Sequence, residues 1–129
     1  MRSRHVSVVV HRPPGEVYAF AALPENLPRW AAGLAQSDVV RDGDALVVGS
    51  PMGQVRVSFV PRNTYGVLDH DVTTPHGTTT RNPMRVLGHP DGAEVLFTVR
   101  QLGRTDDELD GDAALVQADL ERLRTILET

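Results

Sequence analysis

The alternation of apolar and polar residues along the chain predicts a β-strand at its start. Valines alternate with polar residues over residues 4–11, which is the two-residue period of a strand with one buried face. A Pro-Pro-Gly sequence then ends the strand. Apolar residues recur at helical spacing in residues 14–22 and again in residues 25–32. We therefore expect one strand followed by two short helices.

The middle of the chain has the pattern of consecutive short strands. Six β-rich runs are separated by turn residues and cover residues 34–41, 45–49, 54–60, 65–74, 78–87 and 93–102. Connections of hairpin length favour a meandering antiparallel sheet. Pro83 interrupts the fifth run, and a proline at that point predicts an edge position or a bulge.

The last segment has the pattern of a long amphipathic helix. Thr105 and Glu108 form the signature of a capping box at its start. Apolar residues then repeat at spacings of four and three, at Leu109, Ala113, Val116, Leu120, Leu123 and Leu127. Because only one side of this helix is apolar, it must lie on another element. We expect a single α+β domain over residues 1–129, with a curved sheet around the helix and a cavity between them.

Composition narrows the chemistry that this chain can perform. The 13 Lys+Arg residues are all arginine, and the chain has no cysteine. Schiff-base catalysis, a cysteine nucleophile, zinc–thiolate sites and disulfides are therefore excluded. The chain shows no phosphate-binding loop, no dinucleotide motif and no pair of histidines at metal-ligand spacing. Accordingly, we expect neither a metal nor a cofactor.

Charge is distributed unevenly along the chain. The net charge is −4, which argues against a nucleic-acid partner. Residues 104–129 hold three arginines against eight acids, a net −5, and several acids lie in the first helical turns. The helix dipole favours acids there, so this bias is interpreted as helix stabilisation rather than as an acidic docking surface. No apolar run reaches the roughly 20 residues of a membrane span, and we expect a cytoplasmic protein.

Two segments near the start carry a family resemblance. Residues 8–20 (VVVHRPPGEVYAF) and residues 24–30 (PENLPRW) resemble the opening of the START-related, birch-pollen-allergen-like (SRPBCC) superfamily. Residues 68–72 (LDHDV) and 82–86 (NPMRV) are similar to a small bacterial branch described as polyketide cyclase/dehydrase-like. The resemblance implies a helix-grip fold, in which a seven-stranded curved antiparallel sheet wraps around the C-terminal helix and two short helices join strands 1 and 2. It implies a hydrophobic pocket and no shared metal or cofactor.

Three functions agree with this resemblance. The first is binding of a small hydrophobic ligand, lipid- or polyketide-like, in the cavity between sheet and helix. The second is a polyketide cyclase/dehydrase-type enzyme that uses His70 for proton transfer. The third is a non-enzymatic interaction module resembling chaperone activators. An unpaired edge strand would also be suited to forming a homodimer.

His70 is the main candidate for chemistry. Within a strand it shares its face with Leu68 and Val72, whereas Asp69 and Asp71 point to the other face. A histidine on an apolar inner face can be a hydrogen-bonded core residue, a ligand contact or a catalytic acid or base. The residues expected to contact a ligand are Trp30, Phe59, His70, Asn82, Met84, Phe97 and Leu120.

Arg85 and Trp30 each have two interpretations. Arg85 could bind a carboxylate or enolate oxygen of a ligand, or could pair with Asp69 or Asp71 on the outside of the sheet. The hairpin around residues 76–77 makes the ion pair the favoured interpretation. Trp30, the only tryptophan, is expected to pack in the core, with a place at the cavity entrance as the alternative.

Overall fold

The strands and helices follow the order that the sequence predicts. The computed structural model describes residues 1–32, 35 and 39–129. In chain order the elements are β1 (Ser3–Val10), α1 (Pro14–Ala21), the 3₁₀ turn η1 (Pro24–Asn26), α2 (Leu27–Trp30), β2 (Val40–Asp42), β3 (Ala45–Ser50), β4 (Gly53–Phe59), β5 (His70–Thr73), β6 (Thr79–Asn82), β7 (Met84–His89), β8 (Gly92–Arg100) and α3 (Asp106–Glu128). Half of the strand predicted over residues 34–41 lies outside the described residues, and its last two residues belong to β2.

The expected single seven-stranded sheet is wrong. The described residues form eight strands in two antiparallel sheets, with the orders β1-β8-β7 and β2-β3-β4-β5-β6. The strand predicted over residues 78–87 is divided at Pro83 into β6 and β7. Proline has no amide hydrogen for a strand ladder. β6 pairs with β5, whereas β7 pairs with β8, so the chain changes sheets at this residue.

The segment before β5 joins the two sheets. Leu68 N donates to Met84 O at 2.9 Å, and Val86 N donates to Gly66 O at 2.8 Å, so this segment pairs with β7 before the chain enters β5. Gly66 has a φ of +73°, and a Cβ there would lie 2.2 Å from Val86 O. Both the backbone conformation and the close approach require glycine at this position.

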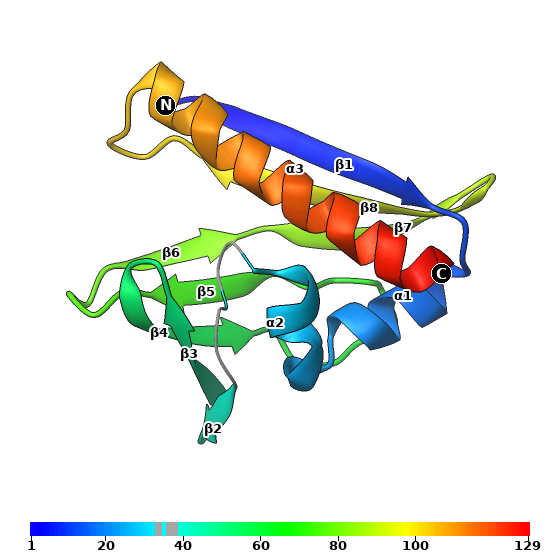
Figure 1. Ribbon diagram of the computed structural model, residues 1–129, viewed down its shortest axis with the longest axis horizontal. Coiled ribbons are helices and arrows are strands. Elements are labelled where there is room, and N and C mark those ends of the chain that lie inside the picture. Colours follow the sequence, from blue (N-terminus) through cyan, green and yellow to red (C-terminus); the bar gives the residue numbers. More distant parts are fainter. Residues whose placement is uncertain (33–34, 36–38) are drawn as a thin grey trace.

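The long helix α3 packs along β1 and β8, as Figure 1 shows. The predicted stripe faces this sheet: Leu109, Ala113, Leu120 and Leu123 are buried, and the other two members are half-buried. The predicted capping box is confirmed. Glu108 N donates to Thr105 Oγ1 at 3.1 Å, and Thr105 N donates to Glu108 Oε1 at 3.0 Å. A cap of this kind stabilises a helix by about 1 kcal/mol.

Two arginine–aspartate pairs lie on the outer face of the sheets. Arg85 donates to both carboxylate oxygens of Asp69, at 3.1 and 3.0 Å, and Arg81 donates to both oxygens of Asp71, at 2.6 and 3.1 Å. The favoured ion pair of Arg85 is therefore confirmed. Asp69 Oδ1 also accepts a hydrogen bond from Met84 N at 2.9 Å, directly after the break at Pro83.

Replacing Gly66 tests whether the junction between the sheets needs glycine. We expect Gly66→Ala to lower the free energy of unfolding by more than about 3 kcal/mol, because strain at φ and a clash with Val86 O add together. Gly43 is the matched control: its φ is +63°, but a Cβ there meets nothing within 4 Å. Gly43→Ala should cost roughly 1 kcal/mol. Urea denaturation measures both, and equal losses would contradict this account.

The Asp69–Arg85 pair makes stability depend on pH. Hydrogen bonds from Arg85 hold the pKa of Asp69 below its ordinary value. The pair therefore stabilises the fold above the unfolded-state pKa, about 3.9, and this contribution is lost as pH falls through the lower folded-state pKa. We expect Asp69→Asn to flatten the decline of unfolding free energy between about pH 5 and pH 2. Exposed Asp91→Asn is the control and should keep the wild-type slope; a wild-type slope in Asp69→Asn would refute the assignment.

Candidate functional site

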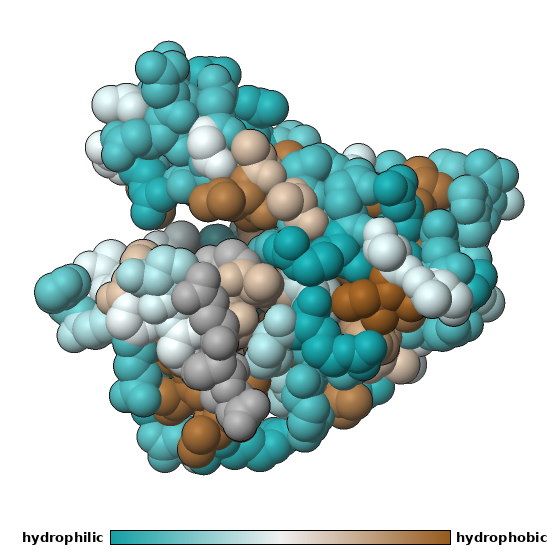
Figure 2. All heavy atoms as spheres, in the orientation of Figure 1, coloured by the Kyte–Doolittle hydropathy of each residue, from teal (hydrophilic) through white to brown (hydrophobic). Residues whose placement is uncertain are grey.

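An open cavity of about 250 Å³ lies between α3 and the five-stranded sheet. Figure 2 shows it as a cleft between the first half of α3 and that sheet, with hydrophobic residues at its edge. Most of its wall is apolar: Leu27, Trp30, Ala31, Met52, Phe59, Val72, Phe97, Val99, Leu102, Leu115, Val116 and Leu120. The polar part of the wall consists of His70, Thr74, Thr80, Asn82, Arg100, Arg104, Asp112 and Asp119.

Six of the seven ligand-contact residues predicted from the sequence lie in this wall: Trp30, Phe59, His70, Asn82, Phe97 and Leu120. Met84 does not belong to it. Met84 is fully buried and stands opposite Phe97 in the β7–β8 pair. The side chain of Met84 is therefore part of the core and not of the cavity wall.

Three predicted residues form one row across the five-stranded sheet. Phe59 of β4 is the direct partner of His70 in β5, and His70 is the direct partner of Asn82 in β6. Directly opposed residues in an antiparallel pair project from the same face, with Cβ atoms roughly 5 Å apart. The row therefore brings an aromatic ring, an imidazole and a carboxamide together on the cavity side of the sheet.

The imidazole of His70 is buried and held in one tautomer. Its Nδ1 lies 2.9 Å from Leu68 O, and because a carbonyl oxygen only accepts, Nδ1 must carry the proton. The ring centroid lies 4.8 Å from that of Phe59 and 5.7 Å from that of Phe97. Burial lowers the pKa of His70, and this effect outweighs the hydrogen bond to Leu68 and the two neighbouring aspartates. The ring is therefore neutral at neutral pH.

The second ring nitrogen of His70, Nε2, is unprotonated and has a free lone pair. Among the described residues, Nε2 has no hydrogen-bond partner. Trp30 Nε1 is the one fully enclosed side-chain nitrogen or oxygen without a partner in that part of the chain, so His70 Nε2 is not enclosed. His70 contributes to the cavity wall, and Nε2 is consequently its acceptor on that wall.

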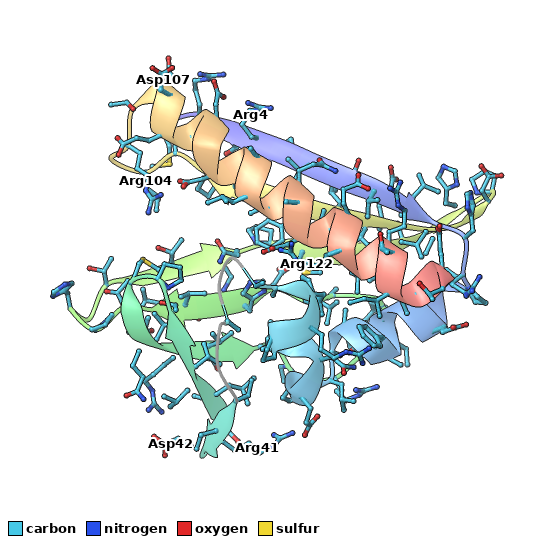
Figure 3. All side chains as sticks on the ribbon, in the orientation of Figure 1. Arg4, Arg41, Asp42, Arg104, Asp107 and Arg122 are labelled. Carbon is cyan, nitrogen blue, oxygen red and sulfur yellow. The ribbon has the colours of Figure 1, made fainter. Side chains whose placement is uncertain are left out.

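Trp30 joins the cavity wall to the core. The side chain is 3% exposed, which confirms the predicted burial, and it also lines the cavity. Arg122 Nε donates to Trp30 O at 3.4 Å, and Arg122 also pairs with Asp119 on the same helix. Figure 3 places Arg122 between α3 and α2. Arg122 therefore links α2 to α3 beside the cavity.

Sequence reasoning missed the apolar rim of the cavity. Met52, Leu102 and Leu115 are 53%, 45% and 60% exposed, and all three belong to the wall. Leu102 has a φ of +53°, a strained conformation for leucine. Leu115 departs from the apolar stripe of α3, and this departure is the signal that could have identified it. Arg104 pairs with Asp112 at the same opening, and Figure 3 shows its side chain directed towards the gap.

The described part of the chain contains no group of three or more histidine, aspartate or glutamate side chains placed to hold a metal ion. None of its helices is long and apolar enough to cross a membrane. The polar groups that line the cavity are a neutral imidazole, a carboxamide, threonine hydroxyls, two arginines and two aspartates.

Comparison with known proteins finds similarity in structure rather than in sequence. No protein-family model matches the chain, and no curated protein matches it significantly. The Aha1 dimer from Colwellia psychrerythraea has a TM-score of 0.79 at 13% identity, with 99% of this chain and 97% of that chain covered. Ara h 8.0201 has a TM-score of 0.63 at 10% identity, with 98% and 97% covered.

A third similar structure belongs to a longer protein. DynU16, a putative protein in the dynemicin biosynthetic locus, has a TM-score of 0.76 at 19% identity, with 98% of this chain covered. This chain spans only 47% of DynU16. The structure has a long C-terminal helix over antiparallel strands and two short helices after the first strand, as the sequence predicts. These likenesses show the fold alone, and that fold is the helix-grip arrangement implied by the resemblance in the sequence.

Proposed function

We propose that the protein binds a small hydrophobic ligand, lipid- or polyketide-like, in the cavity beneath α3. The observation that carries this proposal is the open cavity of about 250 Å³ with a mainly apolar wall. Ligand pockets in proteins are mostly apolar and carry a few polar groups that orient the ligand. Burial of apolar area supplies most of the affinity, at about 25 cal/mol per Å² removed from water.

The exposed rim supports the same proposal. Met52, Leu102 and Leu115 come from the β3–β4 turn, the β8–α3 loop and α3, and they converge on one opening. Exposed apolar side chains scattered singly need no explanation, but a group at the entrance of a cavity is typical of a binding site. A ligand longer than the enclosed space would cover these side chains as it leaves the cavity.

A neutral fluorescent probe tests ligand binding. We expect N-phenyl-1-naphthylamine to bind with saturable fluorescence enhancement, and Leu115→Gln to weaken its binding about five-fold through lost apolar contact. The matched control is Leu87→Gln. Leu87 is also exposed, at 40%, but lies on β7 outside the cavity wall, so its binding constant should be that of the wild type. An absence of saturable enhancement, or equal effects of both substitutions, would contradict the proposal.

An enzyme of the cyclase/dehydrase type is the second candidate, favoured by the free Nε2 of His70. A neutral imidazole beside an apolar cavity can accept a proton from a bound carbon acid. This role predicts that the protein accelerates exchange of the α-hydrogens of 1-tetralone in D2O, measured by NMR, and that His70→Gln abolishes the acceleration. Probe binding by His70→Gln shows that the cavity persists. Equal exchange rates with wild type, variant and buffer would exclude this catalytic role.

A further inference from the structure

Two polar side chains with unused hydrogen-bonding capacity stand next to each other in the cavity. His70 and Asn82 are direct partners across β5 and β6, and both line the wall. His70 uses Nδ1 on Leu68 O and leaves Nε2 as an acceptor. The carboxamide of Asn82 makes no hydrogen bond to any described residue and is not fully enclosed. The acceptor nitrogen of His70 and the carboxamide of Asn82, which has both donor and acceptor atoms, thus lie side by side in one row of the sheet.

The aromatic rings beside this pair give it no hydrogen-bond partner. Phe59 of the same row and Phe97 of β8 flank the imidazole. Aromatic rings do not replace a conventional hydrogen-bond partner, and polar groups in an apolar site bind most favourably to a ligand group that completes them. The pair is therefore available to a polar group of a ligand.

We propose that His70 and Asn82 together recognise a neutral hydroxyl group on an aromatic or enolic ligand. The hydroxyl donates to His70 Nε2 and accepts from Asn82 Nδ2, which one oxygen can do because the two side chains project side by side. Phe59 and Phe97 then contact the carbon atoms next to the hydroxyl. This assignment rests on the proposed ligand-binding function and names the chemical class of its ligand.

The same geometry disfavours the other common oxygen groups. A carboxylate offers only acceptors, and the neutral imidazole presents an acceptor to it. The cations of the wall are elsewhere: Arg104 pairs with Asp112 at the opening, and Arg100 donates to Ser3 Oγ. A methyl group in place of the hydroxyl would leave both polar side chains without a partner. Selection for a hydroxyl over a methyl or a carboxylate is therefore the property that distinguishes this site from a plain apolar pocket.

Displacement of the bound probe measures this selectivity directly. At pH 7, three competitors of the same ring size are titrated against N-phenyl-1-naphthylamine: 2-naphthol, 2-methylnaphthalene and 2-naphthoate. Two hydrogen bonds between neutral groups should make 2-naphthol displace the probe at a concentration about ten-fold lower than 2-methylnaphthalene. We expect 2-naphthoate to be weaker than 2-naphthol. Equal potency of 2-naphthol and 2-methylnaphthalene would overturn hydroxyl recognition. A stronger 2-naphthoate would instead assign the polar end of the ligand to the arginines at the opening.

Variants assign the selectivity to the two residues. Asn82→Leu keeps a side chain of similar size and should reduce the preference for 2-naphthol over 2-methylnaphthalene to about three-fold, because one hydrogen bond is lost. His70→Phe should do the same, and Asn82→Leu serves alone where His70→Phe does not fold. His76→Phe in the β5–β6 turn is the control and should keep the ten-fold preference. A full preference in Asn82→Leu and a folded His70→Phe would refute the assignment.

The competition separates this inference from the function on which it rests. If the probe binds but the competitors show no preference, ligand binding stands and hydroxyl recognition fails. If neither the probe nor any competitor binds saturably, the proposed function itself fails.

Discussion

The change of sheets at Pro83 is the constraint on which the cavity depends. A proline cannot donate to a strand ladder, so the polypeptide leaves the β5–β6 pair there and continues as the partner of β8. Asp69 compensates for the break by accepting a hydrogen bond from the amide of Met84. Gly66 lets the segment before β5 pass close to Val86. With β6 and β8 belonging to different sheets, the two sheets diverge beyond the junction, as Figure 1 shows. The cavity lies between them.

The helix α3 supplies one wall of the cavity between the diverging sheets. Its buried stripe packs on β1 and β8, so the helix is fixed to the three-stranded sheet, and the cavity separates it from the five-stranded sheet. Two members of the stripe, Val116 and Leu120, also form part of the cavity wall, together with the neighbouring residues Leu115 and Asp119. One amphipathic element thereby supplies both the stability of the three-stranded sheet and a wall of the cavity. A shift in the orientation of α3 would change both at once.

Much of the fold follows from local pattern, and the rest depends on tertiary geometry. The alternation of β1, the capping box at Thr105 and the apolar stripe of α3 are local signals, and the structure contains each of them. The inward direction of His70 follows from strand parity. In contrast, the residues on both sides of Pro83 have the same β-pattern, so the sequence does not show that Asn82 and Met84 belong to different sheets. Met52 and Leu102 lie in turns, where no periodicity indicates which side chains meet across space.

The environment of His70 bears differently on the two candidate functions. Burial lowers the pKa of the imidazole, which keeps Nε2 unprotonated but also makes it a weaker base. The hydroxyl of a phenol or an enol can donate a hydrogen bond to Nε2 while it accepts one from Asn82, and its proton stays on the oxygen. Removal of an α-hydrogen from a carbonyl compound demands more of the same nitrogen, because a carbon acid is a weaker acid than a phenol or an enol. The lowered pKa of His70 therefore suits recognition of a hydroxyl better than it suits catalysis on a carbon acid.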